Sequence, residues 1–212
     1  MSTVLLTGFE PFAGDQTNPS GDAVVRLGAA WNGPARLVTA VLPVDFARAG
    51  AELIELVATH RPDVVIATGL AGGRDAITPE RIAVNLRDAR IPDNAGHQPV
   101  DTASIPGAPL AYASSLPVKA IATEIAASGI PASVSLSAGS FVCNDVFFTV
   151  AHVSANTPGL RAGFIHVPWD AENAPPGAAS LPQADITRAL EIAVITTLTY
   201  TRDLDVPAGH LA

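Results

Sequence analysis

One cysteine and one histidine in this chain have the placement of a nucleophile and its base. Cys143 is the only cysteine among 212 residues. It follows the small, turn-forming residues 137–140 and opens an apolar run with helical periodicity. His166 ends the β-prone run 163–166, which a Val-Pro pair closes. We therefore interpret the two side chains as a candidate thiol nucleophile and an imidazole base.

The elements that must position this pair alternate along the chain. Short apolar strands separated by helical patterns predict a parallel sheet that is covered on both faces. We expect one domain spanning 1–212, an α/β fold with three layers (α/β/α) around a twisted, mostly parallel, mixed sheet. Ser20 is the expected N-cap of the first helix. The expected strands are 3–7, 36–42, 63–68, 132–136 and 163–166, and the expected helices are 20–31, 46–60, 117–128, 143–156 and 182–201.

A shared sheet edge is the main reason to connect the two residues. Sites in open parallel sheets form at the carboxyl ends of the strands, where both Cys143 and His166 are expected. The unpaired N–H groups and the dipole at a helix N-terminus favour a thiolate at Cys143. A buried structural cysteine is an equally good interpretation at this point, because free cysteines are among the most buried residues.

The other histidines fit the role of base less well. His152 lies nine residues past Cys143, about 13 Å along a helix that rises about 1.5 Å per residue. It belongs to a polar stripe at helical spacing, so we expect it to face solvent. His60 ends a helix, a common position for a cationic side chain. His97 lies in a loop-rich segment and is a further candidate, and His210 is in the C-terminal tail.

A third group is needed to orient the imidazole. Glu80 lies in the alternating run 78–86 and shares strand parity with apolar neighbours. A carboxylate in such a position costs free energy unless it is paired. Asp93 and Asp170 are alternatives that the sequence leaves open. The next segment, 87–109, is rich in Pro, Asp, Asn and Gly, and irregular segments of this length are often functional.

Composition excludes several classes of function. Apolar residues make up 48% and charged residues 15%, which is typical of a globular protein. The net charge is −8 without a Lys/Arg cluster, so we expect no nucleic-acid binding. One cysteine allows no internal disulfide, and no apolar run reaches the roughly 18 residues of a membrane span. The first residues indicate a strand and not a signal peptide, so we expect a cytoplasmic protein without membrane association.

Four sequence blocks resemble the pyroglutamyl peptidase I family of cysteine peptidases, also called pyrrolidone-carboxylate peptidases. The blocks occur in order along nearly the whole chain, and each contains residues named above. They are Gly8-Phe-Glu-Pro-Phe12 with Asn18-Pro-Ser20; Gly69-Leu-Ala-Gly-Gly-Arg74 followed by Glu80-Arg-Ile-Ala-Val-Asn85 and Arg90-Ile-Pro-Asp-Asn94; Ser137-Ala-Gly-Ser-Phe-Val-Cys-Asn144; and His166-Val-Pro168.

The resemblance implies a role for each matching residue. It implies that Cys143 is the nucleophile, His166 the base and Glu80 the third member of the catalytic group. Leu70 replaces a glutamine that is common in the family, and Val44 occupies a position that is often polar. The substrate that the resemblance implies is a pyroglutamyl residue, whose ring is a neutral lactam. An apolar pocket suits this ring, whereas a substrate with a protonated amine would lose its hydration there. The residues implied at the substrate pocket or near the oxyanion are Phe9, Phe12, Asn18, Leu70, Arg90, Ile91, Phe141 and Val142.

The implied reaction removes an N-terminal pyroglutamyl residue from a peptide through a thioester acyl-enzyme. His166 would hold Cys143 as a thiolate, and backbone N–H groups together with Arg90 would stabilise the oxyanion. The resemblance implies no cofactor and no metal, small peptides as substrates, and assembly into a homotetramer. Two alternatives stay open: a nucleoside-phosphorylase-like enzyme with 69–74 as its phosphate loop, and a non-enzymatic binding protein with a buried cysteine.

Overall fold

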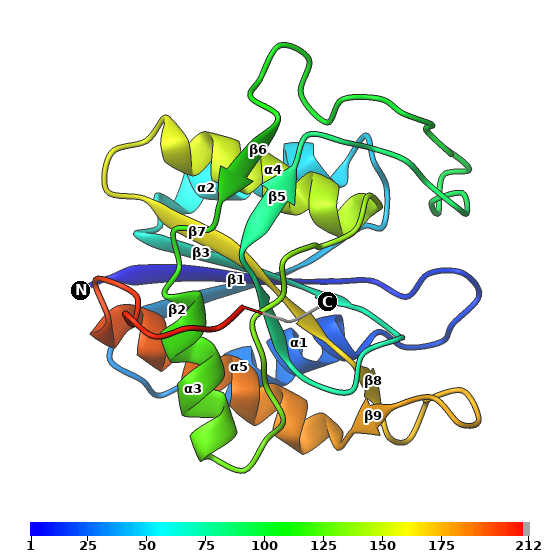
Figure 1. Ribbon diagram of the computed structural model, residues 1–212. Helices are drawn as coiled ribbons and strands as arrows, with labels where there is room; N and C mark the ends of the chain where they lie inside the picture. Colours follow the sequence, from blue (N-terminus) through cyan, green and yellow to red (C-terminus); the bar gives the residue numbers. More distant parts are fainter. Residues whose placement is uncertain (210–212) are drawn as a thin grey trace.

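A five-stranded sheet forms the centre of the computed structural model, which describes residues 1–209 (Figure 1). The strand order is β2-β1-β3-β7-β4, and every pair is parallel except β4 with β7. The predicted α/β class with a mostly parallel, mixed sheet is confirmed. The strands are β1 Thr3–Phe9, β2 Arg36–Leu42, β3 Val64–Leu70, β4 Thr78–Glu80 and β7 Arg161–Val167.

Helices cover both faces of this sheet and complete the three expected layers. Helices α2 (Ala49–His60) and α4 (Val142–Ala155) lie on one face. On the other lie α1 (Pro19–Ala30), α3 (Val118–Ala127) and α5 (Gln183–Thr199). Successive strand side chains point to opposite faces, so the apolar strands supply two separate cores. This explains why the central strands are continuously apolar.

Two helices begin at residues other than those that apolar periodicity indicates, because polar side chains bind the backbone just before them. The first starts at Pro19 with Asn18 as its N-cap, so the expectation of Ser20 as cap is wrong. The Asn18 side chain accepts a hydrogen bond from the Ser20 N–H at 3.1 Å. The second starts at Ala49 and not at residue 46. Asp45 accepts the N–H groups of residues 47 and 48 at 2.7 and 3.1 Å, which delays the helix.

Two strand predictions are also wrong. The run 78–86 is not one strand, because β4 ends at Glu80 and β5 (Ile82–Val84) pairs with β6 (Ala111–Ala113) in a separate sheet. The segment 132–136 forms only isolated parallel bridges, Ile77 with Ala132 and Glu80 with Ser135. The strand parity that we used for Glu80 therefore does not extend into β5. A third short pairing joins β8 (Trp169–Asp170) to β9 (Ser180–Leu181).

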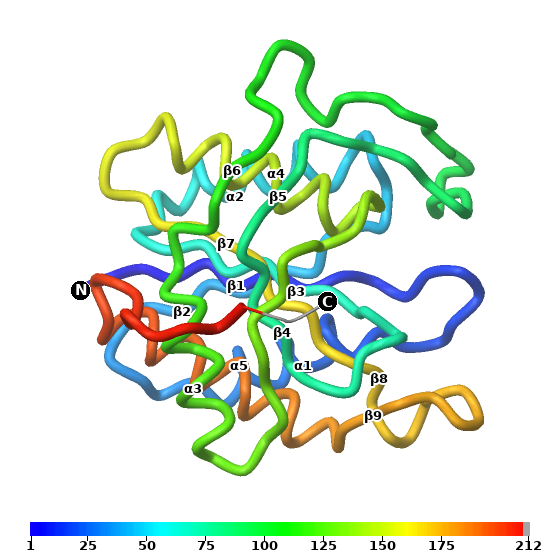
Figure 2. The backbone as a smooth tube through the Cα atoms, viewed as in Figure 1, coloured from blue at the N-terminus to red at the C-terminus, as the bar shows by residue number. Residues whose placement is uncertain are grey.

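The segment between β5 and β6 forms a long irregular excursion, as expected. Figure 2 shows it as the green trace at one end of the molecule. It is fastened to the first turn of α4 by buried polar side chains. Asn144 exchanges hydrogen bonds with the backbone of Val84 at 3.0 and 2.9 Å, and Asp145 makes a two-pronged ion pair with Arg87 at 2.6 and 3.0 Å. Among residues 1–209, no helix has the length and apolar character needed to span a membrane.

Candidate active site

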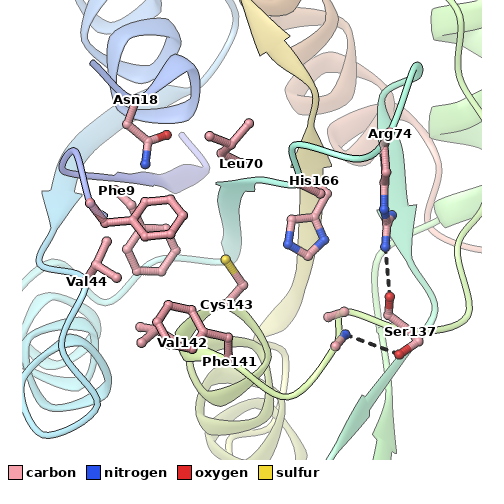
Figure 3. A pocket seen from close by; sticks show the side chains of 14 residues that line it. Phe9, Asn18, Val44, Leu70, Arg74, Ser137, Phe141, Val142, Cys143 and His166 are labelled. Atoms are coloured by element: carbon pink, nitrogen blue, oxygen red, sulfur yellow. Dashed lines mark hydrogen bonds between the residues drawn. The ribbon is translucent and has the colours of Figure 1, made fainter. Parts of the chain in front are cut away.

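A cavity of about 330 Å³ lies where the carboxyl ends of β1, β3 and β7 meet the N-terminus of α4 (Figure 3). Cys143 and His166 both line it, so their expected common edge is correct, although the strand expected before Cys143 forms only isolated bridges. Small-molecule sites usually have volumes of about 300 Å³ or more, so this cavity is large enough for a ring-sized group. Its wall is formed by Phe9, Phe12, Asn18, Val44, Leu70, Ala71, Arg74, Ser137, Ala138, Gly139, Phe141, Val142, Cys143 and His166.

The Cys143 sulfur lies directly over the strand pair that carries His166. Cys143 is the second residue of α4, and its side chain points into the cavity. A Cβ atom built on Gly69 would lie only 2.7 Å from this sulfur. Gly69 and His166 are register partners on neighbouring strands, which run about 4.8 Å apart. The missing side chain at Gly69 therefore makes the space that the Cys143 sulfur occupies in the cavity that His166 also lines.

Glu80 is the acid behind this imidazole in the structure. Its Oε1 atom lies 2.7 Å from Nδ1 of His166, and both side chains are almost completely buried. Burial raises the pKa of Glu80, but its interactions with His166, then with Ser135 and Arg74, outweigh this and hold the pKa below its ordinary value. A carboxylate at Nδ1 favours the tautomer with the proton on Nδ1, which leaves Nε2 free to accept a proton.

Burial of the Cys143 side chain disfavours the preformed thiolate that the resemblance implies. Burial, reinforced by the negative charge of Glu80, raises the pKa of Cys143 to about 12 despite the opposing effect of Arg74. Burial also lowers the pKa of His166, and this outweighs the hydrogen bond and charge of Glu80. Both partners are therefore uncharged near neutral pH. The helix N-terminus does not overcome the desolvation of a thiol in this cavity.

One side of the cavity is built from aromatic and aliphatic side chains. The ring centroids of Phe12 and Phe141 are 6.1 Å apart, and Phe46 packs edge-on against Phe141 at 5.3 Å. Phe9 is buried at the end of β1, and Val44 after β2 is also buried. Val142 and Leu70 complete this apolar wall, which Figure 3 shows on the opposite side of the sulfur from His166.

Asn18 joins this wall to helix α1. Its Oδ1 atom accepts from the Ser20 N–H and hydroxyl groups, and its Nδ2 donates to the Glu10 carbonyl at 2.9 Å. The Ser20 hydroxyl in turn accepts the Phe9 N–H at 3.1 Å. A chain of hydrogen bonds therefore fixes the backbone of Phe9 at the cavity wall.

Two residues that the family resemblance implied do not reach the cavity. Arg90 is exposed, Ile91 is half-buried, and neither lines the cavity. The rivals of Glu80 have other partners. Asp93 accepts backbone N–H groups from residues 46, 95 and 97, and Asp170 accepts from residues 172 and 173.

The remaining histidines are also placed elsewhere. His152 contacts the Tyr112 hydroxyl at 2.9 Å and is half-buried, so the expectation that it faces solvent is wrong. The stripe that contains it includes buried Asp145, which pairs with Arg87 of the excursion, and buried Thr149, which packs against Gly50 of α2. His97 is an exposed neighbour of Asp93 at 3.5 Å. His60 ends α2 as expected, and His210 lies outside the described residues.

One small group of side chains has the spacing of metal ligands. Atoms of Asp45, Asp93 and His97 lie within 4.8 Å of one another. The hydrogen bonds described above already explain both carboxylates, since each accepts backbone N–H groups. This group is therefore part of the loop structure and lies outside the cavity that holds Cys143.

Three residues of the site were not recognised as such from the sequence alone. Arg74 pairs with Glu80 at 2.6 Å, Gly69 leaves room for the sulfur, and Phe46 supports Phe141. A basic residue six positions before the buried acid was a signal for the first. The other two depend on contacts between distant segments, which local sequence patterns do not contain.

The fold and the site together define a class, an α/β protein with a Cys–His–Glu arrangement at the carboxyl edge of its sheet. Comparison with known proteins gives the family. A family model described as pyroglutamyl peptidase matches residues 2–200. A pyrrolidone-carboxylate peptidase of Bacillus amyloliquefaciens is 47% identical over 210 residues, which cover 98% of each chain. One of Bacillus subtilis is 44% identical over 210 residues, with 98% of each chain covered. This chain belongs to the pyroglutamyl peptidase family.

Solved structures agree with this assignment. The pyroglutamyl peptidase I of Bacillus amyloliquefaciens superimposes with a TM-score of 0.94 at 46% identity, covering 98% of this chain and all of that one. The pyrrolidone carboxyl peptidase of Thermococcus litoralis gives a TM-score of 0.92 at 41% identity, again covering 98% and 100%. These matches do not support the phosphorylase alternative. The loop 69–74 accommodates the Cys143 sulfur and carries an arginine that is already paired.

Proposed function

We propose that this protein is a cysteine exopeptidase that removes N-terminal pyroglutamyl residues from peptides. The observation that carries the proposal is the placement of one thiol between an apolar wall and a buried imidazole–carboxylate pair. Membership of the pyroglutamyl peptidase family supports the same activity. We assign Cys143 as nucleophile, His166 as general base and acid, and Glu80 as the group that orients the imidazole.

The proposed reaction begins with an uncharged thiol. His166 Nε2 takes the proton as the Cys143 sulfur bonds to the carbonyl carbon that links pyroglutamate to the next residue. The oxyanion is stabilised by N–H groups of the first turn of α4, which have no intrahelical acceptor. His166 then protonates the leaving amine as the C–N bond breaks. Water, activated by the same imidazole, hydrolyses the thioester and restores the thiol.

The apolar wall is the proposed site for the pyroglutamyl ring. Phe9, Phe12, Phe141, Val142 and Leu70 offer apolar contact, and Asn18 fixes the segment that carries the first two. A neutral lactam loses little hydration in such a place, whereas a free ammonium group would lose much. Arg90 and Ile91 have no part in this proposal because they lie outside the cavity.

We further propose that the chain acts as one domain, in the cytoplasm and as a homotetramer. A reducing compartment keeps a catalytic thiol in its active form. Exposed apolar residues such as Leu110 and Val100 on the excursion, which are 89% and 64% exposed, are suitable for contact between copies. Light scattering of the purified protein tests the tetramer, and a monomeric mass at micromolar concentration contradicts it.

Three chromogenic amides test the substrate class. We expect rapid cleavage of the pyroglutamyl amide and at least about 100-fold lower kcat/KM for the prolyl and glutamyl amides. The prolyl compound keeps the ring but carries an ionisable amine, and the glutamyl compound has an open, charged chain. Equal cleavage of all three contradicts the proposed pocket. Phosphate-dependent cleavage of a nucleoside would favour the phosphorylase alternative. A protein that cleaves none of the amides and whose Cys143 thiol does not react with iodoacetamide would favour the binding-protein alternative.

A further inference from the structure

Arg74 is the one cationic group that contacts the proposed catalytic acid within the described residues 1–209. Its Nη1 atom lies 2.6 Å from Oε1 of Glu80. This is the same oxygen that contacts His166 Nδ1 at 2.7 Å, so one carboxylate oxygen lies between the guanidinium and the imidazole. The Arg74 side chain is 25% exposed and lines the cavity, whereas that of Glu80 is fully buried.

Two further contacts make Arg74 a brace between three segments. Its Nη2 atom donates to the Ser137 carbonyl at 2.8 Å, which fixes the turn that leads into α4 and Cys143. Its Nη1 atom also donates to the Thr78 hydroxyl, and Thr78 is the register partner of His166. Arg74 therefore ties the loop after β3 to the strand that carries Glu80 and to the turn that leads to Cys143, and Figure 3 shows its contact with Ser137.

We propose that Arg74 is a positioning residue that keeps His166 unprotonated, by partly neutralising Glu80 and by opposing a positive charge on the imidazole. An unopposed buried carboxylate next to a histidine stabilises the imidazolium, which cannot accept the thiol proton. A guanidinium on the same oxygen preserves the orienting hydrogen bond and weakens this effect. The charge of Arg74 acts in this direction, since it lowers the pKa of His166.

The charged and titratable groups around His166 come from three elements. Glu80 belongs to β4, Arg74 to the loop after β3, and Cys143 to α4. Strand β3, which pairs with β7 on its other side, has no ionisable side chain between Val64 and Leu70. Asp75 next to Arg74 is exposed. Arg74 is therefore the positively charged group around His166 whose removal should raise the pKa of the imidazole.

NMR titration of histidine-labelled free protein tests this inference directly. The chain has five histidines, and the His166 signal is the one that His166→Asn removes. We expect a midpoint below 6.5 in the wild type and a rise of about one pH unit in Arg74→Gln. Arg81→Gln is the matched control, because Arg81 follows Glu80 but is exposed and lines a different cavity. A midpoint that Arg74→Gln leaves unchanged or lowers overturns the inference.

The variant Arg74→Lys separates the effect of charge from that of geometry. It also provides the test if Arg74→Gln does not fold. Lysine keeps the charge but cannot reach Glu80, Thr78 and Ser137 at once. We expect it to keep the wild-type midpoint, and a midpoint raised as far as in a neutral variant overturns the inference. A kinetic measurement should agree with the titration: the fall of kcat/KM at acid pH should shift with the titration midpoint of His166. This measurement rests on the proposed peptidase function. If the wild type does not cleave the pyroglutamyl amide, that function fails while the NMR titration still decides the role of Arg74.

Discussion

At the scale of single residues, burial determines the charges in the site. Cys143 opens a helix, which usually favours a thiolate, yet burial raises its pKa to about 12. His166 is kept neutral by the same desolvation, although a carboxylate contacts it. A neutral thiol–imidazole pair avoids the cost of two buried charges before substrate binds. The proton then moves only when the sulfur attacks, which makes His166 a base in the transition state.

Gly69 provides a residue-scale prediction. Gly69→Ala places a methyl group 2.7 Å from the Cys143 sulfur and 2.9 Å from the Phe164 ring, so the thiol must move. A displacement of about 1 Å at a reacting atom can cost about 100-fold in rate, and we expect a loss of that order in kcat/KM for the pyroglutamyl amide.

Gly73 supplies the control for this change within the same loop. A Cβ atom there would have no neighbour within 4 Å, and its backbone is not in the left-handed region. Gly73→Ala should therefore retain near wild-type kcat/KM. If Gly69→Ala also retains it, the sulfur does not occupy the position that we describe.

At the scale of elements, the site depends on how α4 begins. Helix α4 has no side-chain cap at Phe141, but Asn144 and Asp145 fasten its first turn to β5 and to the excursion. Apolar periodicity predicts the fold class and the existence of helices α2 and α4. It also predicts the edge of the sheet that holds Cys143 and His166. The first residues of α1 and α2 do not follow from this periodicity, because the side chains of Asn18 and Asp45 bind the backbone there.

The acid behind the base shows the limit of local patterns. Strand parity with Ile82 and Val84 pointed to Glu80. Since β4 and β5 lie in different sheets, this parity does not explain why Glu80 is buried. The pairing of β4 with β7 places Glu80 beside His166, and this is a contact across 86 residues. Phe46 belongs to the site for the same reason, since its partner Phe141 is distant in sequence. Arg74 contacts Glu80 six residues away, and only its contact with Ser137 joins distant segments.

Helix α3 gives an element-scale prediction about stability. Asp203, in the segment after α5, accepts the N–H groups of Lys119 and Ala120 at the start of α3, both at 3.0 Å. Removing such a cap costs about 1 kcal/mol. Asp203→Ala should therefore lower the free energy of unfolding in urea by about this amount without changing kcat/KM, while exposed Asp205→Ala should change neither. Equal stability of the two variants contradicts the capping role.

At the scale of the whole molecule, a doubly covered sheet explains the location of the site. The two cores occupy the faces of the sheet, so the carboxyl edge is where strand ends, loops and the start of α4 leave a cavity. Similarity to family members covers 98% of the chain, and the TM-score of 0.94 extends over the same elements. The long excursion is part of this arrangement because it supports α4 from outside the sheet.

The most direct test of the account is the turnover of a pyroglutamyl chromogenic amide by Cys143→Ala. This change removes the sulfur but adds no bulk, and the neighbouring Asn144 and Asp145 contacts should keep the helix in place. We predict a folded protein, by circular dichroism and urea unfolding, with kcat/KM reduced to background. A folded Cys143→Ala protein that retains wild-type turnover would contradict the assignment of this thiol as the nucleophile.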